Sequence, residues 1–377
     1  MEGKKVGHVP LYVKIANAVT DKIRTGQLKS GDKIVEEDLQ QQFDVSPITT
    51  KKALALLAEQ QLISRVPGKG TFVSDPADLP KQANAEADKT VVFLFPMTDD
   101  GDNALCRSYH LTEILAGVAH ECRRHGYKLA VQDTENEQVK ENILLYAHKK
   151  SNVEGIIIYP SNHEFFSEEL MRSKLENFPF VIVDQYYPQI DTYCVLSDHK
   201  LGTYEATRHL IEQGHEHIGL IMDIEMNSFN IRARIDGYKE CLTDHGLPIH
   251  KDYIFDSTDK TGHIPKDKES VILQEMTAFM RSYPEVTAYL SSSSLFIQAA
   301  HRLGRSIGEE ISVIFIDDSH QAEYHSVTIT AIRQQNRRIG EVAVQMLANP
   351  SSFEDKQVVL KPDLILRNSV AKLSKQG

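Results

Sequence analysis

The sequence contains no tryptophan and few cysteines, four in 377 residues. The four are spread along the chain without any CxxC pair, at Cys106, Cys122, Cys194 and Cys241. This pattern excludes a disulfide framework and indicates reduced thiols in a cytoplasmic protein. His215 and His217 stand close together, but no third ligand follows at a usual spacing, so no metal site is expected.

Long apolar runs are missing too. The chain has no stretch of about 18 apolar residues, so we expect no membrane partner. The first residues, MEGKKVGHV, lack the apolar core of a signal peptide, which argues against a transport-type binding protein.

The signature motifs of several enzyme classes are also missing. The chain has no GxxxxGK[ST] loop, no GxSxG elbow, no HExxH motif and no Gly-rich turn after residues 91–95. We therefore expect neither an enzyme nor a cofactor, and keep a sugar-processing enzyme such as a kinase or isomerase only as an alternative.

Charge is divided unevenly within the net total of −11. Residues 1–74 contain eleven Lys and Arg against eight Asp and Glu, whereas the remainder contains 31 against 45. A basic N-terminal part on an acidic body is typical of a DNA-binding protein whose body stays away from the phosphates.

Residues 44–74 predict a short helix followed by a β-hairpin. Ser46 is a good N-cap, and Pro47 suits the first helical position because its missing N–H costs nothing there. Apolar residues at helical spacing continue the helix, and strands at 62–66 and 71–74 are joined by Pro-Gly-Lys-Gly. With a helix from about residue 11 to Gly26 and another at 36–43, this is the pattern of a winged helix-turn-helix.

In such a domain the helix after the turn, here the one that begins at Pro47, enters the major groove of double-stranded DNA. The β-hairpin, called the wing, lies along the DNA backbone. The candidate DNA-binding residues are Ser46, Pro47, Thr49, Thr50, Lys51, Lys52, Arg65, Gly68, Lys69 and Gly70. We expect Lys51, Lys52 and Lys69 to neutralise phosphates, and Thr49 and Thr50 to lie near base edges. The competing interpretation is a solvated helix face, and Arg65 could equally pair with a local carboxylate.

Residues 75–89, DPADLPKQANAEADK, carry two prolines and almost no large apolar side chain. This composition predicts a linker that lets the N-terminal domain reorient.

Residues 90–377 alternate apolar strands with helices. Strands are expected at 91–95, 128–132, 155–159, 180–184, 218–222, 253–256, 288–291 and 312–317, and helices at 110–125, 137–150, 201–213, 231–246, 268–282 and 294–303. Continuous apolar strands separated by helices indicate parallel sheets covered on both faces. The fold class is therefore α/β with a small α+β head, and its two successive doubly wound lobes would bind a ligand at the carboxyl ends of their strands.

Two resemblances refine these expectations. PLYxxIAxxI, the VSxxT turn and GKGTFV resemble the DNA-binding domain of GntR-type repressors, although Pro47 and Lys51 stand where that family usually has arginines. Further along, VIVD at 181–184, Arg234-Ile-Asp-Gly237, TAIRQ at 330–334 and KPDLILR at 361–367 resemble the effector domain of LacI/GalR repressors. The combination resembles arabinose-type repressors and implies three parts: a head at 1–74, a linker at 75–89 and a periplasmic-binding-protein-like domain at 90–377.

The second resemblance implies a sugar site. The candidate effector-binding residues are Arg234, Asp317, Asp184, Ser293, Phe95, Tyr159 and Tyr186. Arg234 suits two adjacent hydroxyls because its guanidinium is a planar fork, and the aromatic rings suit the C–H face of a sugar. Each has a structural alternative, namely an ion pair or helix cap for the charged residues and the core for the rings. Ser293-Ser294 replace the family's Asn-Asp, and Phe315 replaces a glycine, so an arabinose-like pentose and a deoxyhexose are both compatible.

Together these features predict a cytoplasmic, sugar-responsive transcriptional repressor that binds operator DNA as a homodimer, because one small head makes too few contacts for specific affinity. An activator or dual regulator with the same architecture is the alternative.

Overall fold

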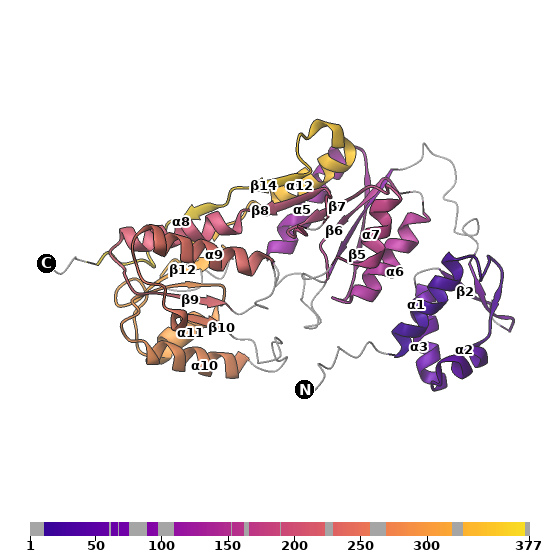
Figure 1. Ribbon diagram of the computed structural model, residues 1–377, viewed down its shortest axis with the longest axis horizontal. Helices are drawn as coiled ribbons and strands as arrows, with labels where there is room; N and C mark the ends of the chain where they lie inside the picture. Colours follow the sequence, from indigo (N-terminus) through magenta and orange to yellow (C-terminus); the bar gives the residue numbers. More distant parts are fainter. Residues whose placement is uncertain are drawn as a thin grey trace. The chain divides into compact units, whose positions relative to one another are not determined.

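The structure, a computed structural model, describes residues 11–59, 62–66, 68–74, 89–96, 109–151, 153–161, 166–188, 190–222, 229–256, 269–318 and 327–373. Almost all of the expected linker lies outside these residues. The chain forms two compact units, of which the first includes the N-terminal domain and the second contains most of the chain after Val181 together with Asp100–Glu121. Figure 1 follows the elements along the chain.

The N-terminal domain is a winged helix-turn-helix. Its elements are α1 (Leu11–Arg24), β1 (Lys33–Ile34), α2 (Glu36–Phe43), α3 (Pro47–Glu59), β2 (Ile63–Val66) and β3 (Gly70–Val73). The strands form an antiparallel sheet in the order β1-β3-β2, with Ile63 opposite Val73. Ile15, Leu39 and Leu54 fill the core between the helices. The predicted helix–turn–helix and hairpin are therefore confirmed, and only the two-residue strand β1 was missed.

One six-stranded sheet has the order β14-β8-β7-β6-β4-β5. Its strands are β4 (Thr90–Phe95), β5 (Lys128–Asp133), β6 (Gly155–Ile158), β7 (Phe180–Val183), β8 (Cys194–Ser197) and β14 (Gln357–Leu360). The pairings β4–β5, β4–β6, β7–β8 and β8–β14 are parallel; Val92, for example, lies opposite Ala130 and Ile156. Every residue of β6 and β7 is buried, as the apolar runs predicted.

The second six-stranded sheet has the order β10-β9-β11-β12-β13-β15. Its strands are β9 (Ile218–Met222), β10 (Ile254–Asp256), β11 (Ala288–Ser291), β12 (Ser312–Ile316), β13 (Thr330–Arg333) and β15 (Asp363–Ile365). All pairings are parallel except β13–β15.

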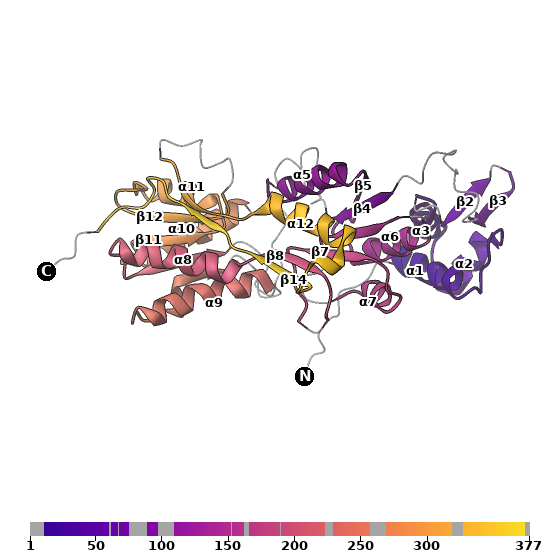
Figure 2. The ribbon, with the colours of Figure 1, turned by 90° about the horizontal axis from the view of Figure 1, so that it is seen from above.

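Helices cover both faces of this second sheet. The helices are α8 (His199–Glu212), α9 (Phe229–Asp244), α10 (Glu269–Ser282) and α11 (Leu295–Arg302). Leu210 and Tyr238 from α8 and α9 pack on one face, where the two helices run side by side in both views (Figures 1 and 2). Met276 and Phe296 from α10 and α11 pack on the other face.

The remaining elements are α5 (Tyr109–Arg124), α6 (Gln138–Lys149), α7 (Glu168–Leu175), α12 (Asn336–Ala348) and the short 3₁₀ turns η1 (Lys251–Tyr253) and η3 (Pro350–Ser352).

The end of the chain corrects the expectation that one lobe simply follows the other. After α12 the chain adds β14 to the first sheet beside β8, and then β15 to the second sheet beside β13. Short strands with polar positions carry little periodicity, so β8, β13, β14 and β15 were not predicted. No helix of the described residues is long and apolar enough to span a membrane.

Candidate functional site

The start of α3 is built as the sequence predicts. The hydroxyl of Ser46 accepts the backbone N–H of Thr49 at 3.4 Å and lies 3.0 Å from the Thr49 hydroxyl. Thr50, by contrast, is fully buried, and its hydroxyl donates to the carbonyl of Ser46 at 3.5 Å. The expectation that Thr50 lies at a base edge is therefore wrong, because its place on the helix faces the core.

The four basic candidate residues of the N-terminal domain are at the surface. Lys51 and Lys52 on α3, and Arg65 and Lys69 at the wing, are exposed. Among the described residues no ion pair holds Lys51, Lys52, Arg65 or Lys69, so they remain candidates for phosphate contacts.

The wing depends on its glycines. Gly68 and Gly70 have φ values of 74° and 123°, which favour glycine. A Cβ at Gly70 would also lie 2.8 Å from Cε of Lys33. The stem of Lys33, on β1, therefore crosses the wing and adds a cation that the sequence analysis missed.

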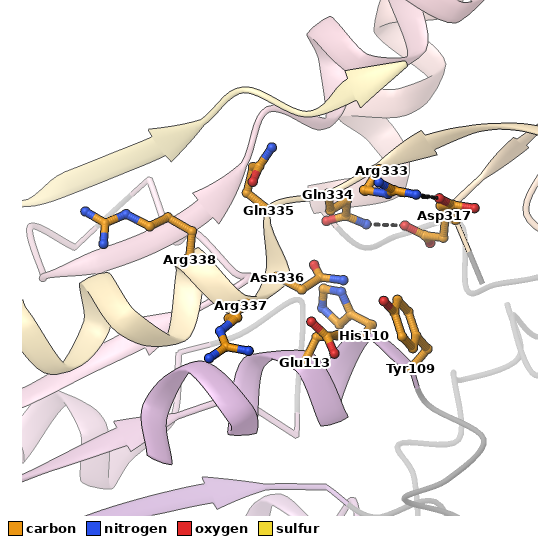
Figure 3. Close-up of a pocket in the computed structure, with 11 residues that line it drawn as sticks. Tyr109, His110, Glu113, Asp317, Arg333, Gln334, Gln335, Asn336, Arg337 and Arg338 are labelled. Carbon is orange, nitrogen blue, oxygen red and sulfur yellow. Dashed lines mark hydrogen bonds and ion pairs between the residues drawn. The ribbon is translucent and has the colours of Figure 1, made fainter. Parts of the chain in front are cut away.

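A second site is a cavity of about 350 Å³ in the C-terminal unit. It lies where β12 and β13 end and where α5 and α12 begin, which fits the rule that ligands bind at the carboxyl ends of parallel strands. Its lining is Tyr109, His110, Glu113, Asp317, Asp318, Arg333, Gln334, Gln335, Asn336, Arg337 and Arg338 (Figure 3).

Two glycines bring α5 and α12 together beside this cavity. A Cβ on Gly117 would lie 1.9 Å from the carbonyl oxygen of Arg337, and one on Gly340 would lie 2.1 Å from that of Ile114. Only glycine allows backbones to approach this closely. This crossing places the first turns of α5 and α12, which carry His110 and Asn336, at the same cavity.

Asp317 is the most strained residue of the site. Its φ of 120° lies in a region that favours glycine, and such strain in a folded protein is concentrated at functional sites. Its carboxylate accepts a hydrogen bond from the Gln334 amide and lies 3.4 Å from the Arg234 guanidinium. Arg234, on α9, lines a neighbouring cavity of about 10 Å³ and is not among the described residues that line the larger one, which it reaches through Asp317.

Asp184 follows β7 and is held between two histidines. Its carboxylate lies 3.0 Å from Nε2 of His110 and 3.3 Å from Nε2 of His199, and its backbone carbonyl accepts from the Asn230 amide at 2.9 Å. Burial opposes its ionisation, but the two imidazoles hold the pKa of Asp184 well below its usual range. Asp184 does not line the cavity, so it acts on that space through His110.

The pKa values of the two histidines beside Asp184 shift in opposite directions. Burial alone would lower the pKa of His110, but the Asp184 carboxylate outweighs it and the pKa is raised. For His199 burial prevails and the pKa is lowered. His110 therefore lines the cavity with its Nε2 against the Asp184 carboxylate, which favours the protonated imidazole.

Several buried polar atoms near Asp317 and Asp184 find no hydrogen-bond partner among the described residues. They are Oγ of Ser197, Oδ1 of Asn230, Nε of Arg234, Oε1 of Gln334 and Oδ1 of Asn336. Unsatisfied buried groups are costly, so their concentration in one place indicates that a polar ligand or water completes the site.

The other predicted effector residues are placed differently. Phe95 is buried and stacks on Phe93 with ring centroids 5.2 Å apart, so its expected role in a sugar site is wrong. Ser293 is buried, and its hydroxyl accepts the backbone N–H of Leu295 at 3.3 Å. Tyr159 follows β6 and Tyr186 packs edge-on against Phe229, and both are partly buried. Neither lines the cavity.

The residues that sequence reasoning missed are Tyr109, His110, His199, Asn230, Gln334 and Asn336. Gln334 could have been found, because it follows a strand as Asp317 does. Within the described part of the chain no three His, Cys, Asp or Glu side chains are arranged to hold a metal. Burial raises the pKa of the Cys194 and Cys241 thiols to about 12, which leaves both protonated and unreactive.

Comparisons with known proteins agree with the two parts of the fold. Residues 11–73 match the model of bacterial regulatory proteins of the gntR family, and residues 207–370 match a periplasmic binding protein-like domain. The arabinose metabolism transcriptional repressor of Geobacillus stearothermophilus is 26% identical over 97% of this chain and 99% of its own length. The HTH-type transcriptional repressor PurR of Haemophilus influenzae (strain PittEE) is 29% identical over 69% of this chain and 77% of its own length.

Solved structures show the same fold for the body. A regulatory protein of the LacI family from Chloroflexus aggregans superposes with a TM-score of 0.64 at 21% identity, covering 74% of this chain and 98% of that one. The transcriptional regulator CelR–cellobiose complex superposes with a TM-score of 0.63 at 20% identity, covering 86% and 91%. These relatives are transcriptional regulators rather than enzymes. The chain thus combines a gntR-family DNA-binding domain with a periplasmic binding protein-like domain of the kind found in LacI-family regulators.

Proposed function

We propose that this protein is a transcriptional repressor of a sugar-utilisation operon that a sugar releases from its operator. The observation that carries the proposal is the presence of two separate surfaces in one chain. One is an exposed basic helix and wing at α3 and β2–β3, and the other is the cavity at Asp317 with its unsatisfied polar groups.

The chemistry of the cavity fits a polyhydroxylated ligand. Sugar hydroxyls both donate and accept, so they suit the carboxylate of Asp317, the open amide oxygens of Gln334 and Asn336, and the imidazole of His110. The partly buried ring of Tyr109, which lines the cavity, can cover a C–H face. The Arg234 guanidinium, which is not among the described residues that line the cavity, lies next to the Asp317 carboxylate. A relative that covers 97% of the chain is named for arabinose metabolism, which makes a pentose the first candidate and a deoxyhexose the second.

Operator binding requires two copies of the chain. A single winged helix-turn-helix buries too little surface for specific affinity, and a symmetric dimer places two recognition helices on half-sites about 34 Å apart. We therefore infer a homodimer that reads a palindromic operator.

A thermal-shift screen of L-arabinose, D-xylose, L-fucose and L-rhamnose tests the ligand part of the proposal. A ligand at 100 times its Kd stabilises the folded state by about 2.7 kcal/mol, which raises the Tm of the body by roughly 5–10 °C. The sugar that does so should also weaken binding of the selected operator. A panel without any shift, together with unchanged operator affinity, would refute sugar control.

A further inference from the structure

Ile48 is the most exposed of the large apolar side chains described in the N-terminal domain. It is 69% exposed, against 47% for Leu11 and 38% for Val66. A single exposed apolar residue is common on protein surfaces and carries no argument alone. What matters is its place, because Ile48 is the second residue of α3, the helix expected to enter the major groove.

The neighbours of Ile48 leave it as the side chain most available to a base. The hydroxyls of Ser46 and Thr49 lie 3.0 Å apart and bond to each other, and that of Thr50 is buried and bonds to the backbone. Pro47 has neither a backbone donor nor a polar side chain. The first turn of α3 therefore presents mainly apolar surface to DNA.

The charges next to Ile48 fix which face of the helix approaches DNA. Lys51 and Lys52 are three and four residues further on, so they share the face of α3 that carries Ile48. Both are exposed. When these lysines meet phosphates, Ile48 points toward the base edges, since the first turn of a recognition helix is the part that reaches them.

The major groove offers one apolar feature to such a side chain, the C5-methyl group of thymine. We propose that Ile48 packs against a thymine methyl in each half-site of the operator and is a residue that determines the operator sequence. This inference rests on the proposed function, because it requires that the N-terminal domain bind a specific DNA sequence.

The test uses the full-length protein and a duplex obtained by selection from random DNA. Each thymine of the selected duplex is replaced in turn by deoxyuridine, which removes only the C5-methyl group. Binding is then measured for the wild type, for Ile48→Ala, and for Leu11→Ala as a matched change at another exposed apolar residue.

At one thymine in each half-site, loss of the methyl should weaken wild-type binding about fourfold, which corresponds to about 0.8 kcal/mol for one buried methyl group. The Ile48→Ala variant should bind both duplexes equally, whereas Leu11→Ala should discriminate between them as the wild type does. Ile48→Val, which keeps a branched side chain, should retain most of the discrimination.

Uracil tolerance at every position in the wild type would overturn the proposal, and so would discrimination that persists unchanged in Ile48→Ala. Failure to select any preferred duplex would be a different result. It would refute sequence-specific DNA binding, and with it the proposed function itself.

Discussion

The N-terminal domain and the cavity of the body carry their candidate functional groups in opposite ways. On α3 and the wing these groups are exposed lysines and one exposed isoleucine. None of these lysines forms an ion pair with another described residue. Beside the cavity several groups are buried and joined to others, as Asp184 is to His110, His199 and Asn230.

This difference predicts how each region responds to mutation. An exposed group makes its main contact only with DNA, so its loss should affect binding and leave the folded state unchanged. A buried, paired group belongs to the packing of the body, so its loss should change stability and ligand affinity together. The following predictions test that contrast, beginning with the largest effect.

Asp184→Ala should have the largest effect. Removing one partner of a buried pair leaves His110 and His199 without the carboxylate that they contact and costs about 3–5 kcal/mol. Urea denaturation monitored by circular dichroism measures this loss. Asp191→Ala is the matched control, because Asp191 forms an exposed ion pair with Lys356, and such pairs contribute at most about 1 kcal/mol. Equal losses in the two variants would remove the basis of the comparison.

Arg234→Ala should weaken the ligand response together with the stability of the fold, because Arg234 is buried and paired with Asp317. Without the guanidinium that faces it, Asp317 loses its orienting partner, and loss of a charged hydrogen bond costs about 1.5–3 kcal/mol. Sugar affinity should fall 10- to 100-fold, while operator binding stays at the wild-type level. Arg234→Lys, which keeps the charge but not the planar fork, should lose part of this affinity. A variant that releases operator at wild-type sugar concentrations would exclude Arg234 from the response.

The His110–Asp184 pair should make stability depend on pH. Because the pKa of His110 is raised in the folded protein, its contribution is fully present below its ordinary pKa of 6.5 and is lost as pH rises through the folded value. The stability difference between the wild type and His110→Gln should therefore shrink on going from pH 6 to alkaline pH. A difference that grew over this interval would mean that the imidazole is neutral in the folded protein.

Lys52→Ala should have the smallest effect on the fold, with stability unchanged within about 0.5 kcal/mol. Operator and random DNA should both bind less tightly, and the slope of log affinity against log salt should fall by about 1. Lys251→Ala, at an exposed lysine of the body, is the control and should change neither quantity. A change of sequence preference alone would show that Lys52 contacts bases and not phosphates.

The same contrast explains what could be predicted from the sequence. The helices and hairpin of the N-terminal domain are set by local signals, such as the cap at Ser46 and the glycines of the wing. The helix α2 accordingly begins and ends at the predicted residues Glu36 and Phe43. Thr50 was misassigned because its helical position faces the core, which residue type alone does not show.

The cavity could be predicted only in part. Asp317, which lines the cavity, and Arg234, which contacts Asp317, could be singled out because each stands beside a recognisable motif. His110 and Asn336 come from segments more than 200 residues apart, which meet through the close crossing of Gly117 and Gly340. Ser293 has the right chemistry, but its hydroxyl accepts the backbone N–H of Leu295. Spacing along a chain cannot show which polar groups the fold has already paired.

The most direct test of the proposed function is calorimetric titration of the effector sugar into the protein with and without saturating operator. If sugar releases the protein from DNA, linkage requires that operator weaken sugar affinity by the same factor by which sugar weakens operator affinity. We expect that factor to lie at about 5- to 150-fold, the usual range of allosteric coupling. Equal sugar affinities in the two titrations would contradict release by the sugar, and tighter sugar binding in the presence of operator would show that the sugar is a corepressor.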